Sequence, residues 1–313
     1  MTDQKKIIAI VGATGAQGGG LARAIMDDPA GPFKARILTR DATGAKAREF
    51  ADRGAEVVAA DTHDPDSLKR AFAGAWGAYC VTFFWAHFSP DKEMAEAKGM
   101  ADAARANGLQ HVIWSTLEDV RKFIPLADTR MPTLLGHYKV PHFDAKGEAD
   151  RFFDGLPVTY LLASFYWENL VQMAPKPGPD GKLTLALPMG DKKLAGIAAE
   201  DIGRTAYGIF KRGSSLLGQR IGVAGEHLTG TEMAAAMTRA LGREIAYFSP
   251  TPDAYRAFGF PGADELGNMF QFYADCAEPV NGIRDVARTR SLNPGLLTFE
   301  AWLAVNKDRI PVS

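Results

Sequence analysis

The sequence is poor in cysteine, carries no excess charge of one sign and lacks long apolar runs. Its 313 residues include two cysteines, Cys80 and Cys276, which are too few for a disulfide framework. The 36 lysines and arginines nearly balance the 37 aspartates and glutamates, so no basic surface favours direct binding to nucleic acid. No apolar run reaches the ~20 residues that a membrane-spanning helix needs. The composition therefore favours a globular protein with a small-molecule ligand.

Metal-ligand spacings, internal repeats and targeting segments are also missing from the sequence. No pattern such as His-x-x-x-His occurs, so we expect no metal site and predict surface or partly buried positions for His63, His87, His111, His137 and His227. The first residues, MTDQKK, lead directly into an apolar segment and leave no room for a signal peptide. With the low cysteine content, this N-terminus predicts a cytoplasmic protein.

The segment Ile7–Gly20, IIAIVGATGAQGGG, organises the rest of the chain. Its first residues are apolar, as in a strand that is buried on both faces of a parallel sheet. Gly12, Gly15 and Gly18 follow, and apolar residues with a helical period come next. A turn with few side chains lets backbone N–H groups approach a pyrophosphate, and the start of the following helix carries a partial positive charge. The segment therefore predicts a strand, turn and helix that bind a dinucleotide.

Strands and helices alternate through the first half of the chain. After the first strand, the pattern predicts strands at Phe33–Thr39, Ala55–Ala60, Gly77–Thr82, Gln110–Ser115 and Leu156–Leu162. The predicted helices are Thr43–Arg53, with Asp41 or Thr43 available as its cap, then Asp64–Phe72, Pro90–Asn107 and the segment from Pro141 to Phe153. The pair Asn107-Gly108 predicts a left-handed stop at the end of the helix that begins at Pro90. Strands joined by helices in this way form right-handed crossovers. The fold class is therefore α/β, with a Rossmann doubly wound parallel sheet.

The second half has a more mixed pattern, which predicts a smaller α+β C-terminal lobe interleaved with the sheet. We divide the chain into an NAD(P)-binding Rossmann domain, residues 1–163, and the lobe, residues 164–313. In the lobe we predict a hairpin at Pro175–Lys182 and helices at Ala199–Phe210, Gly230–Leu241 and Gly262–Ala274. The segment Thr116–Val140 holds several prolines and no sustained period. It predicts a long loop beside the site that is mobile until a cofactor binds.

The end of the second predicted strand indicates which cofactor the site prefers. In a Rossmann sheet this position lies beside the adenosine ribose, where an acid suits a 2′-hydroxyl and a base suits a 2′-phosphate. Thr39 and Arg40 occupy the position, and the planar guanidinium of Arg40 suits a phosphate. The alternative is a solvated surface arginine. With the glycine turn present, the pattern favours NADP(H) over NAD(H).

Two other strand ends carry candidate ligands of the cofactor. Asp61 follows the third strand, where its carboxylate either accepts a hydrogen bond from the adenine amino group or caps the next helix. Thr82, Phe83 and Phe84 close the fourth strand at the edge of the sheet where ligands collect. The alternative for Phe83, Phe84 and Trp85 is a place in the core between the two lobes.

Six segments that span nearly the whole chain form a collinear set: GATGAQGG, LTR, GAEVVAAD, HFDAKGE, ENL and FPGADELGNMFQFY. Through them the chain resembles the NmrA-like family, atypical members of the short-chain dehydrogenase/reductase superfamily, and especially its cytosolic NADP(H)-sensing branch. The resemblance implies that NADP(H) is bound by Gly12, Ala13, Thr14, Gly15, Ala16, Gln17, Arg40, Asp61, Thr82, Phe83 and Phe84. It also implies contacts from Lys146, Tyr166, Trp167, Glu168 and Asn169.

The Tyr-x-x-x-Lys pair, in which a lysine lowers the pKa of a phenol and holds the nicotinamide ribose, is missing from the sequence. Tyr138 is followed four residues later by His142, and Pro141 favours a helix start that leaves Tyr138 outside the helix. Ser115 lies at the end of the fifth strand, where enzymatic relatives place a serine, or it is a plain turn residue. This departure from the enzymatic pattern argues against ordinary carbonyl reduction.

His142, Lys146 and Asp150 share one face of their predicted helix because they are four residues apart. In reductases of the isoflavone type, which the chain resembles more distantly, a lysine in this helix is the general base. Lys146 and His142 are therefore the candidate catalytic residues. The alternative for Lys146 is a contact to the ribose or nicotinamide without proton transfer.

Two functions follow as competing hypotheses. The first is an NADP(H) sensor or regulator with little classical dehydrogenase activity, which binds a protein partner or a second copy according to cofactor state. The missing Tyr-x-x-x-Lys pair favours it. The second is an NADPH-dependent reductase of a quinone, an enone or a small aromatic substrate. Lys146 favours it, together with the aromatic residues Phe83, Trp85, Tyr166 and Trp167.

Overall fold

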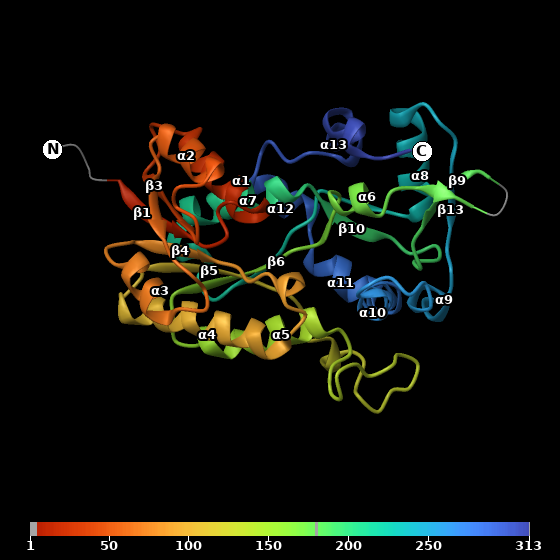
Figure 1. Ribbon diagram of the computed structural model, residues 1–313, viewed down its shortest axis with the longest axis horizontal. Coiled ribbons are helices and arrows are strands. Elements are labelled where there is room, and N and C mark those ends of the chain that lie inside the picture. Colours follow the sequence, from red (N-terminus) through yellow and green to blue (C-terminus); the bar gives the residue numbers. More distant parts are fainter. Residues whose placement is uncertain (1–4, 179–180, 313) are drawn as a thin grey trace.

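A seven-stranded parallel sheet forms the centre of the computed structural model, which describes residues 5–178 and 181–312 (Figure 1). The strands follow the order β11-β6-β5-β4-β1-β2-β3. Their bounds are Lys6–Ile10 (β1), Phe33–Thr39 (β2), Glu56–Ala59 (β3), Gly77–Cys80 (β4), His111–Thr116 (β5), Val158–Leu162 (β6) and Arg220–Gly222 (β11). The strand order reverses beside β1, so the sheet is doubly wound, as the sequence predicts.

Helices cover both faces of this sheet (Figure 1). One face carries α1 (Ala16–Met26), α2 (Ala45–Asp52), α7 (Ala199–Arg212) and α12 (Val286–Leu292). The other carries α3 (Pro65–Phe72), α4 (Pro90–Ala106) and α5 (Pro141–Ala149). Strand β1 contributes apolar side chains to both faces of the sheet. Ile8 and Ile10 pack on the face that carries α1, and Ala9 packs on the face that carries α4.

The second half of the chain returns to the sheet through α7 and β11. α7 lies directly against α1, and the contact depends on glycine in both helices. A Cβ atom on Gly20 would lie 2.4 Å from the Glu200 carbonyl oxygen, and one on Gly203 would lie 2.2 Å from the Leu21 nitrogen. Neither distance is compatible with a side chain. The chain after residue 163 therefore completes the Rossmann layer, while the domain boundary itself stays a prediction.

The remaining elements form the smaller lobe, at the right of Figure 1. Its strands are β7 (Phe165–Tyr166), β8 (Lys176–Pro177), β9 (Leu183–Ala186), β10 (Leu194–Ile197), β12 (Glu226–Leu228) and β13 (Ile245–Phe248). Its helices are α6 (Asn169–Gln172), α8 (Gly230–Leu241), α9 (Pro252–Arg256), α10 (Ala263–Asp275), α11 (Ala277–Ile283) and α13 (Phe299–Asn306). β8 and β9 pair antiparallel as the predicted hairpin requires, and residues 179–180 lie outside the described residues, as do residues 1–4 and 313.

Short 3-10 helices connect several of these elements. They are η1 (Phe84–Ala86), η2 (Val120–Lys122), η3 (Asp150–Phe153), η4 (Gly213–Leu216) and η5 (Lys307–Arg309). η3 continues α5, so the predicted helix from Pro141 to Phe153 is an α-helix followed by a tighter turn. Within the described ranges, none of the helices combines the length and the apolar character that crossing a bilayer requires.

The helix ends correct one sequence prediction and confirm another. α2 begins after Gly44, without a side-chain cap, so the prediction that Asp41 or Thr43 caps this helix is wrong. Asp41 instead accepts hydrogen bonds from the backbone and the hydroxyl of Thr43, at 3.0 and 2.9 Å, and closes the turn before the helix. At the end of α4, Gly108 has φ +60°, which confirms the predicted left-handed stop.

The long loop between β5 and α5 is anchored within the protein. Met131 and Lys139 are fully buried, and the Lys139 ammonium donates to the carbonyl oxygens of Asp128 (2.8 Å) and Met131 (2.7 Å). Asn268 on α10 donates to the carbonyl oxygen of Lys139 at 2.6 Å. Residues 125–127, which precede these anchors, and residues 135–137, which lie between Met131 and Lys139, are exposed. The loop is irregular, as predicted, but its ends are held by polar contacts.

Candidate functional site

In the glycine turn between β1 and α1, the backbone occupies positions that side chains would otherwise fill. Gly12 has φ +67°, and its carbonyl accepts the N–H of Gly15 at 2.9 Å. A Cβ atom on Gly18 would lie 2.6 Å from the Gly12 carbonyl oxygen, so only glycine allows α1 to approach the turn this closely. Within the described chain, no side chain caps α1 at Gly15. Its first N–H groups therefore suit an anion.

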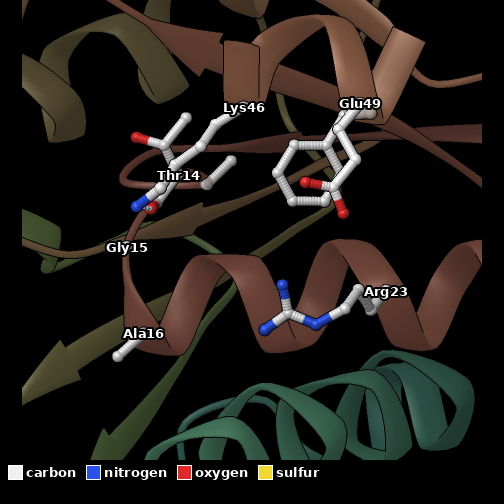
Figure 2. Close-up of a pocket in the computed structure, with 8 residues that line it drawn as sticks. Thr14, Gly15, Ala16, Arg23, Lys46 and Glu49 are labelled. Carbon is white, nitrogen blue, oxygen red and sulfur yellow. Dashed lines mark hydrogen bonds between the residues drawn. The ribbon is translucent and has the colours of Figure 1, made fainter. Parts of the chain in front are cut away.

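A cavity of about 320 Å³ opens beside this turn (Figure 2). It is lined by Ala13, Thr14, Gly15, Ala16, Arg23, Lys46, Glu49 and Phe50. The Lys46 ammonium donates to the Thr14 carbonyl oxygen at 3.3 Å, and Figure 2 shows Arg23 facing the cavity from α1. A turn with only small side chains, with Arg23 and Lys46 beside it, matches what a dinucleotide pyrophosphate and its adenosine end require. Lys46 was not predicted as a site residue, although it lies in the first turn of α2, shortly after Arg40.

Arg40 and Asp61 lie at the same edge of the sheet because β2 and β3 pair in parallel, with Thr39 opposite Ala59. Arg40 is exposed. The backbone N–H of His63 donates to the Asp61 carboxylate at 3.0 Å and is the main cause of the lowered pKa of Asp61, to which the charge of Arg40 also contributes. The alternative that Asp61 caps α3 is wrong, because Asp64 accepts the N–H groups of that first turn.

Gln17 joins three strands beneath the glycine turn. Its Oε1 atom accepts the hydroxyls of Ser115, at 2.8 Å, and of Tyr79, and its Nε2 atom donates to the Tyr166 hydroxyl. Burial raises the pKa of Tyr166 to about 12, so its phenol stays protonated at neutral pH. Ser115, which stands where enzymatic relatives place a serine, is thus hydrogen-bonded to Gln17. The predicted Gln17 and Tyr166 positions come together in one network.

Lys146 reaches the carboxyl end of β4 from α5. Its ammonium contacts the Thr82 hydroxyl, donates to the Thr82 carbonyl oxygen at 3.3 Å and lies 2.8 Å from Oε1 of Glu93. The Thr82 hydroxyl donates to the same Glu93 oxygen at 2.5 Å. Glu93 is fully buried, while 11% of the Lys146 side chain remains exposed. Of the two partners in this buried ion pair, Lys146 is therefore the one that solvent reaches. Glu93 was not predicted as a site residue, because no local pattern in α4 indicates a partner on α5.

The helix face that carries Lys146 does not act as one cluster. His142 turns to α10, where Nδ1 lies 2.6 Å from Oε1 of Glu265. Asp150 accepts from the Trp114 indole at 2.9 Å and pairs with Arg220 at 2.6 Å. The predicted sharing of one face by His142, Lys146 and Asp150 thus leads to three separate sets of partners. His142 makes a contact between lobes and is not next to the Lys146 ammonium.

The aromatic candidates divide into exposed and buried side chains. Phe83 is 66% exposed directly after β4, whereas Phe84 is 2% exposed, so the core alternative applies to Phe84. Trp167 is 1% exposed and packs on Phe299 and Trp302. The Glu168 carboxylate accepts from the Ala199 nitrogen and the Trp302 indole, each at 2.9 Å, and Asn169 is exposed. The side chains of Trp167 and Glu168 therefore stabilise the lobe.

The doubly wound parallel sheet, with a glycine turn at its centre and a basic cavity beside that turn, defines a Rossmann-type nucleotide-binding fold. The model of the NmrA-like family matches residues 4–303. The chain therefore belongs to the NmrA-like family.

Known proteins resemble the chain over most of its length. An NmrA-like family domain-containing oxidoreductase, FrzB of Cladobotryum sp., is 26% identical over 85% of this chain and 83% of that protein. An NAD(P)H azoreductase of Xenophilus azovorans is 30% identical over 84% of this chain and 86% of that protein. Among solved structures, the negative transcriptional regulator NmrA in complex with NAD is 26% identical, with a TM-score of 0.77 over 96% of this chain and 95% of that one. The same regulator has also been solved with NADP.

Proposed function

We propose that the protein is an NADPH-dependent reductase of quinones, enones or small aromatic compounds, and that Lys146 donates the proton in the reaction. The observation that carries this proposal is the pair of Lys146 and Glu93 at the carboxyl end of β4. In a doubly wound sheet, ligands bind outside this edge, and the nicotinamide end lies beyond the pyrophosphate turn. NADPH, when bound, supplies the hydride. The similarity to an azoreductase and to family oxidoreductases supports a reductase.

The residues around Lys146 fit the role of a proton donor. Glu93 and Thr82 hold the ammonium in one position, through the ion pair and a hydrogen bond to the Thr82 carbonyl oxygen. A developing negative charge on a substrate oxygen or nitrogen would accept a proton from this ammonium. The exposed ring of Phe83 offers an apolar surface beside it, which suits a planar aromatic substrate. The roles of Tyr166, Trp167, Glu168 and Asn169 toward the cofactor stay predictions.

The preference for NADPH over NADH rests on Arg40, with Lys46 at the neighbouring cavity. We expect Arg40→Ala to weaken NADPH binding about tenfold to a hundredfold, because a charge-assisted phosphate contact contributes ~1.5–3 kcal/mol, and to leave NADH binding unchanged. Calorimetric titration with both cofactors measures this. Arg48→Ala is the matched control, because Arg48 is an exposed arginine of α2 that does not line the cavity. Equal affinities of the unmodified protein for NADPH and NADH would contradict the preference.

A cytoplasmic NADP(H) sensor is the second candidate function. The missing Tyr-x-x-x-Lys pair favours it, as does the hydrogen bond that joins Ser115 to Gln17. In this alternative, cofactor binding changes the surface presented to a protein partner or a second copy. Lys146 would connect the cofactor to this surface, because it lies on α5 and the loop 116–140 leads directly into α5. The similarity to the regulator NmrA, solved with NAD and with NADP, supports this candidate.

Hydrogen exchange separates the sensor from an enzyme that only turns over substrate. If the protein is a sensor, saturating NADPH should protect the exposed parts of the loop, residues 125–127 and 135–137, from exchange. A ligand shifts such an equilibrium only by its different affinity for the two states, so Lys146→Ala should reduce this protection more than it reduces protection at the glycine turn. Equal exchange of the loop with and without NADPH would reject the sensor and leave the reductase.

A further inference from the structure

Beneath Lys146 lies a group of four side chains, His63, His87, Glu93 and Glu96, which we call the acid–imidazole cluster. Glu93 and Glu96 project from α4, and the two histidines come from the segments after β3 and η1. The side chains of Glu93, Glu96 and His87 are 0%, 7% and 7% exposed, whereas His63 is 53% exposed. The cluster thus begins in the interior at the Lys146 ion pair and ends in solvent.

Polar atoms follow one another through this cluster at short intervals. Oε1 of Glu93 lies 2.8 Å from the Lys146 ammonium. Oε2 of Glu93 lies 3.7 Å from Nε2 of His87, which lies 3.9 Å from Oε1 of Glu96. Oε1 of Glu96 then lies 3.2 Å from Nε2 of the exposed His63. Four titratable groups therefore connect Lys146 to the surface.

Two of these atoms indicate a binding site for a small polar molecule, such as water, inside the cluster. Glu93 Oε2 and His87 Nε2 are buried and have no hydrogen-bond partner in the described part of the chain. One ligand atom from each of His87, Glu93 and Glu96 lies within 4.8 Å of the other two. Separations of 3.7 and 3.9 Å are too long for direct hydrogen bonds and match the span that one bridging water covers. A buried unpaired carboxylate oxygen is costly, so such a bridge would be strongly held.

The same three residues have ligand types that a divalent metal could use, but the tautomer of His87 opposes a metal. The backbone N–H of Ser89 donates to Nδ1 of His87 at 3.1 Å, so Nδ1 is the acceptor of the ring. Burial lowers the pKa of His87, so the ring is neutral at neutral pH and its one proton is on Nε2. An N–H group donates to a water or a carboxylate and cannot ligate a metal.

The charges around the cluster suit proton transfer toward Lys146. Burial, and then the charge of Glu93, raise the pKa of Glu96, which makes its protonated form accessible. The Thr62 hydroxyl and the charges of His63 and Lys146 act in the opposite direction on Glu96. The charge of Lys92 on α4 helps to lower the pKa of His87, and Asp61 lies 3.0 Å from Nδ1 of His63. The outermost pair, Asp61 and His63, is open to solvent.

We propose that His63, Glu96 and Glu93 form a proton path from solvent to Lys146, with His87 holding the water that joins the two carboxylates. The path rests on the proposed function. In the reduction of a quinone, NADPH provides two electrons and one proton as hydride, and the Lys146 ammonium provides the second proton and becomes a neutral amine. The lost proton is then replaced along the path: protonated His63 passes a proton to the Glu96 carboxylate, Glu96 passes it through the water to the Glu93 carboxylate, and Glu93 passes it to the amine. Solvent restores the proton on His63, so charge and atoms balance.

The path is tested with variants at its outer end, where the Lys146 ion pair is untouched, and NADPH affinity is measured because the His63 ring also contacts Asp61. We expect Glu96→Gln and His63→Ala each to lower kcat for quinone reduction at least about tenfold at about pH 8, with little change in NADPH affinity by calorimetry. Added imidazole should restore the activity of His63→Ala, because it replaces the missing ring at the surface, but not that of Glu96→Gln. Asp102→Asn, an exposed carboxylate of α4 outside the cluster, is the control and should retain full activity.

A second measurement, which does not depend on catalytic turnover, tests the tautomer of His87. Nitrogen NMR of the cofactor-free protein should show His87 protonated at Nε2 and not at Nδ1. The opposite tautomer, or a shift of this ring on adding Zn²⁺, would overturn the path in favour of a metal site. Unchanged kcat in both Glu96→Gln and His63→Ala would also overturn the path while leaving the reductase intact. No turnover by the unmodified protein would instead reject the proposed function, and the path with it.

Discussion

Replacing Gly15 by valine is expected to remove NADPH binding while leaving the fold intact. Gly15 has φ −96°, so its backbone conformation is open to any residue, and a Cβ atom there would lie 3.2 Å from the Gly12 carbonyl oxygen. That contact needs only a small adjustment. The branched side chain would instead occupy the cavity beside the turn, where the pyrophosphate must approach the backbone N–H groups.

We expect the affinity of Gly15→Val for NADPH to fall at least about a hundredfold, or ~2.7 kcal/mol. Calorimetry measures the affinity, and circular dichroism on the same sample reports the fold. Gly18→Val is a poor substitute, because its Cβ would lie 2.6 Å from the Gly12 carbonyl oxygen and would disturb α1 itself. Gly282→Val is the control, since Gly282 has open space around it in α11. Retained NADPH affinity in Gly15→Val would mean that the turn does not hold the phosphates.

Replacing Lys146 by methionine should have the largest effect on the reaction. Loss of a positioned proton donor lowers rates about 10²–10⁴-fold, so we expect a fall in kcat of this size. The same change leaves the buried Glu93 carboxylate without its cation. Removing one partner of a buried ion pair costs about 3–5 kcal/mol of folding free energy, so Lys146→Met should also lower the melting temperature.

The double variant Lys146→Met, Glu93→Gln separates these two effects. The glutamine is neutral and still accepts a hydrogen bond from the Thr82 hydroxyl, so the melting temperature should recover most of its loss. The proton donor remains absent, and kcat should stay low. Thermal unfolding and NADPH oxidation measure the two quantities on the same samples. If the double variant regained activity together with stability, Lys146 would be a structural residue and not the proton donor.

The fold was largely predictable because its signals are local. The apolar run of β1, the three glycines and the alternation of strands with helices fix six of the parallel strands through residues close in sequence. The seventh, β11, is three residues long and pairs with β6, which lies far away in the chain. No local pattern marks such a strand, and its place depends on α7 packing against α1 through Gly20 and Gly203.

The residues of the site also divide into those with a local signal in the sequence and those that depend on tertiary packing. The glycine turn and Arg40 are readable because strand ends in a parallel sheet meet at one edge. Glu93 is not, since its role depends on the approach of α5 to α4. His142 was predicted as a site residue because it shares a helix face with Lys146, yet its ring contacts the Glu265 carboxylate on α10. Spacing along a helix predicts which residues share a face, while tertiary packing decides what each of them meets.

The measurement that tests the account most directly is oxidation of NADPH by the unmodified protein with a panel of quinones, enones and azo compounds, run beside Lys146→Met and beside calorimetric titration of the cofactor. We predict that NADPH binds both proteins and is oxidised with at least one substrate class, and that oxidation falls about a hundredfold or more in the variant. Tight binding of NADPH without turnover of any substrate, or equal turnover by both proteins, would contradict the account.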